Sequence, residues 1–340
     1  MANSYLNKTF GTPTDTKKYT MSVWVKRATL GVQQSIARST NGNDDSHVFT
    51  FNSDDTLRWD EYGSSSTIGT LKTNRKFRDI SAWYHVVLWY DSANSTAGDR
   101  MRMWINGVEE TSFATDTNPS LNADSAFNKA SQPINIGRTS YSGGGNYFDG
   151  YLAHMAFVDG ANVAHTTFGE TDSTSGIWKF KSPSGITWGT NGFHLKFENS
   201  GNLGLDSSSN ASNWTVNGNL TQSVDTPSIN YVTLNPLLSS GSGQVTHSRA
   251  NTRTGTGNGI TYLTMMPTTG KWFCEFHFQT AGAGQDNGIG FWSVPEAQTI
   301  AFYSSGFKGI VWKYAGNVYV NGSNNAFSSN TFTSGDIISV

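Results

Sequence analysis

The chain has 340 residues, and its 23 basic and 25 acidic side chains give a formal net charge of −2 at pH 7. This balance provides no general attraction to nucleic acid or to anionic lipid, so neither is an expected partner. No run of about 20 apolar residues occurs, and we expect no membrane insertion. The single cysteine, Cys274, excludes an intrachain disulfide and is expected to be a buried, inert thiol.

The composition is typical of an all-β protein. Glycine numbers 36, and aromatic residues make up 13% of the chain. Aromatic residues favour strands, whereas glycine, asparagine and serine favour the turns between them. We find no sustained apolar stripe at helical spacing, so long helices are not expected.

Short runs of alternating apolar and polar residues predict the strands of the first part of the chain. In chain order we expect them at residues 19–26, 47–51, 56–62, 83–90, 101–105, 134–137 and 148–159. The clearest pattern is the pair from Trp83 to Gly107, which ends in a tight Asn106-Gly107 turn because both residues tolerate positive φ. Many short strands separated by turns predict a sandwich or a barrel.

The rest of the chain divides into an irregular stretch and a second β pattern. Residues 161–237 hold a short strand at 193–197, a polar tract at 206–213 and an extended run at 225–236. Further strands are expected at residues 261–266, 270–280, 286–292, 309–314 and 317–320. Because the sequence stops at Val340 in the middle of an apparent strand, we expect the natural chain to continue.

Five strings in the first half carry a family resemblance. They are TMSVWVKR (20–27), WYHVVLWYD (83–91), MRMWINGVE (101–109), INIGR (134–138) and FDGYLAHMAFVDG (148–160). In this order they resemble laminin-G-like, concanavalin-A-like jelly-roll domains. The resemblance covers about half of the chain and implies a lectin-like sandwich.

Two further resemblances cover the remainder. The strings NSYLNKTF, FGETDSTSGIW (168–178), 191–218 and 225–236 are similar to structural proteins of bacteriophages, of the tail-fibre or virion-surface type. The strings GKWFCEFHF, NGIGFW and SGDIISV resemble a SPRY-type β-sandwich, although Ser339 stands where that family has glycine.

We therefore predict an all-β chain with a laminin-G/concanavalin-A-like jelly roll followed by a second, SPRY-like β-sandwich. The expected parts are a jelly roll at residues 1–160, an irregular β appendage and linker at 161–237, and an incomplete SPRY-like sandwich at 238–340.

Enzymatic activity has weak support in the sequence. Retaining glycosidases need two carboxylates about 5–5.5 Å apart on one face. The nearest pattern, Glu170-Thr-Asp172-Ser-Thr-Ser175, has serine at its last position and loop-like neighbours. Gly255-Thr-Gly257-Asn-Gly259 lacks the lysine and the helix of a phosphate-binding loop. We predict that the protein is not an enzyme, with a polysaccharide depolymerase on the same fold as the alternative.

Metal binding is a weaker expectation than sugar binding. The seven histidines are scattered without zinc-type spacing, and His85 is expected to be a packed strand residue. Calcium could bind oxygen ligands at a sandwich rim, and the candidates are Asp44, Asp45, Asp54 and Asp55. The alternative is that these residues only form turns, which aspartate favours. No other cofactor is expected.

Sugar binding needs an exposed aromatic ring beside polar side chains, because the ring stacks on the C–H face of a pyranose. The candidates form two groups, one of Trp59, Asp60 and Tyr62 and one of Tyr141, Asn146 and Tyr147. For each aromatic residue the alternative is packing in the core. Trp24, Trp83, Trp89 and Trp104 are expected to pack rather than to bind a ligand.

Together these patterns predict a non-enzymatic virion surface protein, in a tail or head fibre or a decoration layer, that attaches to host-surface glycans. It would be assembled in the host cytoplasm and would contact other virion proteins. Exposed edge strands favour homo-oligomers, and a trimer is one such assembly. A purely structural decoration protein without a ligand is the third hypothesis.

Overall fold

The computed structural model describes residues 3–40, 45–64, 66–139, 145–241, 245–248, 252–255, 259–265, 273–279, 288–292, 309–325 and 331–339. In these ranges the chain is all-β and contains no α-helix, as the sequence predicted. No helix among the described residues is long and apolar enough to cross a membrane. The chain forms two compact units, Met1–Thr233 with Ser248–Thr252, and Leu234–His247 with Arg253–Val340.

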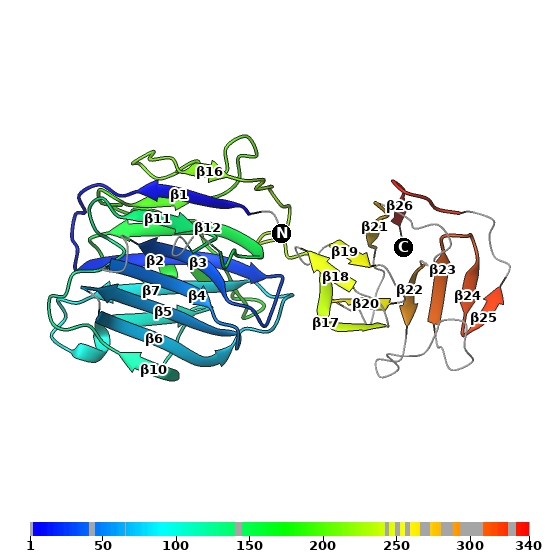
Figure 1. Cartoon of the computed structure of the whole chain (residues 1–340), viewed down its shortest axis with the longest axis horizontal. Helices are drawn as coiled ribbons and strands as arrows, with labels where there is room; N and C mark the ends of the chain where they lie inside the picture. The colour runs from blue at the N-terminus through cyan, green and yellow to red at the C-terminus, as the bar shows by residue number, and fades with distance from the viewer. Residues whose placement is uncertain are drawn as a thin grey trace. The chain divides into compact units, whose positions relative to one another are not determined.

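The first unit is a sandwich of two antiparallel sheets (Figure 1). The larger sheet has the spatial order β10 (Phe113–Thr117), β6 (Ser66–Lys76), β5 (Thr56–Gly63), β4 (Asp45–Phe51), β3 (Gln34–Thr40), β11 (Pro133–Ile136), β1 (Tyr5–Thr9) and β16 (Thr215–Asn217). The smaller sheet has the order β15 (Phe193–Leu195), β12 (Gly150–Asp159), β2 (Lys18–Arg27), β7 (Tyr84–Asp91), β8 (Met101–Ile105) and β9 (Val108–Glu109).

The inward-pointing side chains, at every second strand position, fill the space between the two sheets. Every second residue of β2 and β7 points inward, so Val23 and Leu88 join a buried core that also contains Tyr19, Trp59 and Phe157. The rings of Tyr19 and Tyr90 stack with centroids 5.4 Å apart. Burial of many large aromatic rings supplies the main stabilising free energy of this unit.

The tight turn predicted at Asn106-Gly107 is present between β8 and β9. Asn106 has φ of 50° and Gly107 has φ of 79°, values that most residues adopt only with strain. A Cβ atom at Gly107 would lie 2.4 Å from the ring of Trp178. Glycine is therefore required here both by the backbone conformation and by the close packing of that ring.

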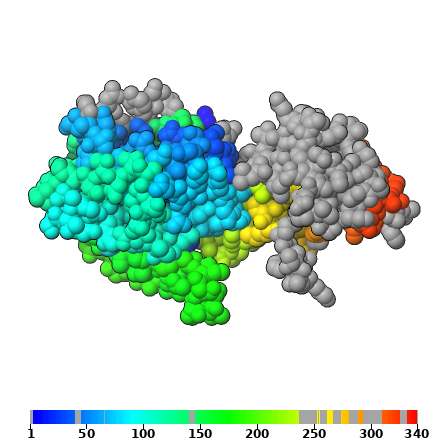
Figure 2. Space-filling view, turned by 90° about the horizontal axis from the view of Figure 1, so that it is seen from below, coloured from blue at the N-terminus to red at the C-terminus, as the bar shows by residue number. Residues whose placement is uncertain are grey.

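Residues 160–233 cover the outer face of the smaller sheet. This segment contains the 3₁₀ turn η2 (His165–Thr167) and a hairpin of β13 (Gly169–Thr171) and β14 (Trp178–Phe180). Trp24 and Trp83, which point outward from β2 and from the start of β7, pack under Trp178 and Phe180. The covering segment also supplies β15 and β16, and its green residues lie along one side of the unit in Figure 2.

Four histidines lie within this covered layer, which we call the histidine layer (His85, His154, His165 and His194). His85 is buried, stacks on Trp24 with centroids 4.6 Å apart and accepts a hydrogen bond from Trp178 Nε1 at 3.0 Å. Burial lowers the pKa of His85 to about 3 and the pKa values of His154 and His194 to about 4. The expectation that His85 is a packed strand residue is confirmed.

The described part of the second unit consists of small sheets. They pair β17 (Leu234–Gly241) with β20 (Gly259–Leu263), β18 (Val245–Ser248) with β19 (Thr252–Gly255), and β21 (Glu275–His277) with β26 (Ile337–Ser339). A fourth sheet has the order β22 (Gly288–Trp292), β23 (Gly309–Lys313), β24 (Val318–Val320) and β25 (Ser323–Asn325). The thiol of Cys274 is half-buried rather than fully buried, and burial raises its pKa.

Candidate functional site

The outer face of the larger sheet carries a row of side chains across its strands that are polar except for Val48. In register, Asp60 of β5 pairs with Val48 of β4, and Val48 pairs with Arg38 of β3. The row continues through Asn135 of β11 to Asn7 of β1. These residues alternate with core residues along each strand, so they face away from the sandwich. We call this surface the outer face.

Charged side chains are fixed on the outer face by ion pairs. Arg58 and Asp60 lie two residues apart on β5, with Arg58 Nε 2.9 Å from Asp60 Oδ1 and Arg58 Nη2 2.6 Å from Asp60 Oδ2. The Asp60 side chain is mostly buried, whereas the Arg58 side chain is 44% exposed. The guanidinium keeps unused N–H groups for a hydroxyl or carboxylate acceptor, because it has five donors.

An aromatic cluster occupies the β1 side of the same face. The Arg138 guanidinium lies over the Tyr5 ring, 3.4 Å from its centroid, and Tyr147 lies 6.5 Å from Tyr5 between centroids. Arg138 Nε also donates to Asn135 Oδ1 at 3.1 Å, and Asn217 Nδ2 donates to Asn7 Oδ1 at 2.6 Å. Tyr5 and Tyr147 are partly exposed. Polar groups and partly exposed rings therefore meet here, as a sugar platform requires.

The structure separates the first group of sugar-binding candidates. Asp60 and the partly exposed Tyr62 lie on the outer face, but Trp59 is fully buried. Its ring packs in the core against Tyr19, with centroids 6.3 Å apart, and its Nε1 faces Glu61 Oε1 at 3.4 Å. The prediction that Trp59 offers a stacking surface is wrong, because adjacent strand residues point to opposite faces and Tyr62 points outward.

The second group is only partly described. Asn146 is exposed and its Nδ2 donates to Gln33 Oε1 at 3.3 Å, next to Tyr147, while Tyr141 lies outside the described residues. Tyr62 on β5 and Tyr5 on β1 are four strand spacings apart, which is roughly 20 Å. The two groups therefore share one face without forming one compact pocket, and the spacing suits an extended chain.

The described calcium candidates all bind cationic side chains. Asp45 accepts from Lys129 Nζ at 2.5 Å, and Asp54 accepts from Lys72 Nζ at 2.9 Å. Asp55 lies between two arginines, with Arg27 Nη1 and Arg78 Nε at 3.1 and 2.9 Å. Burial raises the pKa of Asp55, but the Gly31 N–H and the two arginines outweigh it, so the net shift is downward.

These contacts disfavour calcium at all three carboxylates, because a bound cation would have to displace a partner of the same sign. Asp44 lies outside the described residues. Among the described residues, no three His, Cys, Asp or Glu side chains gather as a metal site.

Glu170 and Asp172, the residues nearest to a glycosidase pattern, make contacts within their own hairpin. The Asp172 carboxylate accepts from the N–H groups of Thr174 and Ser175 at 3.0 and 2.9 Å, and it binds Lys179 Nζ at 3.0 Å. These contacts lower the pKa of Asp172. Glu170, in β13, lies 3.7 Å from Lys179 Nζ. The pair thus stabilises the hairpin that covers the smaller sheet.

A buried acid network was not foreseen from the sequence. Glu61, which points inward from β5, accepts from Tyr19 Oη at 2.5 Å, from the Ala126 N–H at 2.7 Å and faces His47 Nδ1 at 2.9 Å. Burial alone would raise the pKa of the Glu61 carboxyl, but attraction to His47 and these hydrogen bonds outweigh it and the pKa falls. The network ties the 125–127 loop to the core and has no access to solvent.

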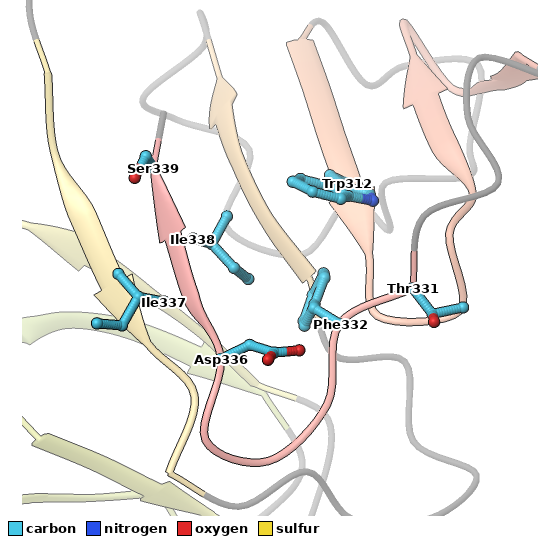
Figure 3. Close-up of a pocket in the computed structure, with 7 residues that line it drawn as sticks. All are labelled: Trp312, Thr331, Phe332, Asp336, Ile337, Ile338 and Ser339. Carbon is cyan, nitrogen blue, oxygen red and sulfur yellow. The ribbon is translucent and has the colours of Figure 1, made fainter.

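The second unit contains a hollow of about 600 Å³ (Figure 3). Trp312, Phe332, Ile337 and Ile338 are among the residues that line it, and the side chains of Ile337 and Ile338 project from opposite sides of β26. Its one carboxylate, on Asp336, accepts from the Thr333 N–H at 2.6 Å and so is used by the turn before β26. The described lining offers no group of converging polar side chains, and we assign no ligand to it.

The comparisons with known proteins agree with the fold of the first unit. Residues 2–166 match the family model described as the Concanavalin A-like lectin/glucanases superfamily. The first unit therefore contains a concanavalin A-like, lectin-like domain of the laminin G type. No curated protein matches the chain.

Solved structures with similar folds cover parts of the chain at low identity. A putative carbohydrate binding protein from Bacteroides ovatus is 16% identical with a TM-score of 0.43, covering 66% of this chain and 59% of its own. A heptameric SAP-like pentraxin from Limulus polyphemus is 17% identical with a TM-score of 0.36, covering 48% and 73%. The sialidase CBM40 of Ruminococcus gnavus, bound to α2,3-sialyllactose, is 14% identical with a TM-score of 0.31, covering 43% and 84%. These scores are too low to transfer a binding site.

Proposed function

We propose that the chain is a non-enzymatic bacteriophage virion surface protein, in a tail or head fibre or a decoration layer, that binds host-surface glycans. One observation supports glycan binding above the others. On the outer face, the rings of Tyr5, Tyr62 and Tyr147 lie on the same side of one rigid sheet as Arg58 and Asn7. Rings for stacking and donors for hydroxyl groups are thus held in place before a ligand arrives.

The virion location and the SPRY-like character of the second unit rest on the sequence resemblances. Assembly in the host cytoplasm, contact with other virion proteins and homo-oligomers such as a trimer belong to the same proposal. Immunogold labelling of intact particles with an antibody to this chain tests the location. Gold on neither head nor tail would contradict it.

Binding can be tested on the full chain with immobilised host polysaccharide and a glycan array. We expect binding by the wild type and at least about a fivefold loss for both Tyr62→Ala and Tyr147→Ala, since stacking of a ring-shaped ligand on one aromatic side chain contributes about 1–3 kcal/mol. Tyr231→Ala is the matched control, because this tyrosine is 46% exposed and lies beside Lys26 of the smaller sheet, away from the outer face of the larger sheet. Equal losses in all three variants would contradict a site on the outer face.

The same material separates the other two hypotheses. Release of new reducing ends by the wild type, but not by a Glu170→Gln/Asp172→Asn variant, would establish a depolymerase and refute the non-enzymatic proposal. Absence of binding to every glycan, together with dense ordered copies on the particle, would favour a purely structural decoration protein.

A further inference from the structure

A lysine, an aspartate and an asparagine meet where the covering segment ends. The Lys26 side chain points outward from β2 and is 0% exposed, and its Nζ lies 2.7 Å from Asp225 Oδ2. The same nitrogen lies 2.7 Å from Asn230 Oδ1 and 3.1 Å from the Tyr231 carbonyl oxygen. Trp83 Nε1 donates to the other Asp225 oxygen at 2.8 Å.

This arrangement places the amine of Lys26 against the carboxamide oxygen of Asn230, and so close to the carboxamide carbon. Because a C=O bond adds only about 1.23 Å to the measured 2.7 Å, Asn230 Cγ lies no more than about 3.9 Å from Lys26 Nζ. Reactive contacts require about 3–3.5 Å, so a movement of well under 1 Å would bring the atoms together. Asn230 Nδ2 donates to the Ser81 carbonyl at 2.8 Å, which holds the carboxamide from its other side.

We propose that Lys26 and Asn230 form an intramolecular amide bond, with Asp225 moving the protons. The Lys26 Nζ lone pair attacks Asn230 Cγ, a bond forms between these atoms, and Asp225 takes a proton from the amine. The Cγ–Nδ2 bond then breaks, Asp225 returns the proton to the leaving nitrogen, and ammonia departs. No oxidant, reductant or co-reactant is needed, and the product is an amide between β2 and residue 230.

The surroundings support each role. Burial lowers the pKa of the Lys26 ammonium more than Asp225 and Asp79 raise it, which increases the share of the nucleophilic neutral amine. Asn230 is exposed, so ammonia can leave to solvent. Asp225 is 5% exposed and touches both the amine and Trp83, which keeps its carboxylate directed at the reacting atoms.

Intact mass spectrometry of the full chain tests the bond. We expect the wild type to be about 17 Da lighter than its sequence, from loss of one ammonia, and Lys26→Met, Asn230→Ala and Asp225→Ala to have their full sequence masses. An amide to Asp225 instead would cost one water, about 18 Da, and would overturn the assignment to Asn230.

Peptide mapping makes the result independent of how the variants fold. In the wild type, trypsin should yield peptide 19–27, uncut after Lys26, joined to peptide 197–249, because no lysine or arginine lies between those bounds. A succinimide at an Asn-Gly pair such as Asn106-Gly107 also loses ammonia, but it hydrolyses at pH 8.5 and joins no peptides. A full-mass wild type, or separate peptides 19–26 and 197–249, would refute the bond.

Discussion

We predict that the histidine layer makes the first unit sensitive to mild acid. His85, His154 and His194 are held neutral in the folded chain, with pKa values of about 3, 4 and 4, whereas an unfolded histidine titrates near 6.5. Since the unfolded chain binds protons first, stability is complete above pH 6.5 and falls as the pH drops toward 4. At pH 5 each histidine costs the folded state about 2 kcal/mol, and the three together about 6 kcal/mol.

This loss is comparable to the whole stability of an ordinary domain, which is about 5–15 kcal/mol. Groups around the layer modulate it, since Glu198 and Asp206 raise the histidine pKa values and Lys196 lowers them. The carboxyls of Asp55 and Glu61 have lowered pKa values, so their contribution is lost only below about pH 4.5. Unfolding between pH 6.5 and 5 therefore reports on the histidines.

Urea unfolding of the full chain, followed by tryptophan fluorescence at pH 7.5 and 5.0, measures the effect. His154→Phe keeps the stack on Phe180, whose centroid is 3.6 Å away, and loses no bond at Nδ1, which has no partner. We expect this variant to reduce the pH dependence by about 2 kcal/mol, and the exposed His277→Gln to leave it unchanged. Identical free energies of unfolding at both pH values in the wild type would refute the reasoning.

Two other substitutions test the core and the turn. Glu61→Gln should destabilise the first unit by about 2–4 kcal/mol because it removes the charge from a fully buried network. Its control is Asp54→Asn, which alters an exposed ion pair and should cost under about 1 kcal/mol in the same urea titration. Gly107→Ala should reduce the free energy of unfolding by more than about 1 kcal/mol and lower the thermal midpoint, since φ of Gly107 is 79° and Trp178 blocks the added methyl group. Gly98→Ala is the control, because a Cβ atom at Gly98 would have nothing within 4 Å. Equal midpoints for the two alanine variants would show that the turn tolerates strain.

Alternation predicted several of the strands that face the core, because a buried face leaves a clear period of two, but β1 and β3, which supply Leu6 and Ile36 to the core, were not expected. It predicted β2, β5, β7 and β8 within one or two residues at each end. The polar strand β6 and the three-residue strands β13 and β16 were not expected. Their sequences hold few apolar residues, and strand pairing rather than local propensity keeps them extended: β16 pairs with the distant β1, β6 pairs with β5 and β10, and β13 pairs with the nearby β14.

The sugar-binding candidates show where pattern reasoning was applied incompletely. Trp59 and Asp60 are neighbours on one strand, so period two already places them on opposite faces, and only one could accompany Tyr62. The cluster of Tyr5 and Arg138 could not be predicted, because it joins β1 to the end of β11 across more than 130 residues. Register between distant strands is set by the tertiary fold and leaves no local signal.

The outermost tryptophans and β1 depend on residues far beyond the part of the chain that matches the family model. That match ends at residue 166, yet the unit runs to Thr233 and supplies both the hairpin over Trp24 and the strand beside β1. A gene shortened to the matched region would therefore release a sandwich with indole rings facing water and an unpaired edge, and such a product should aggregate. A shortened gene should therefore still encode the residues up to Thr233.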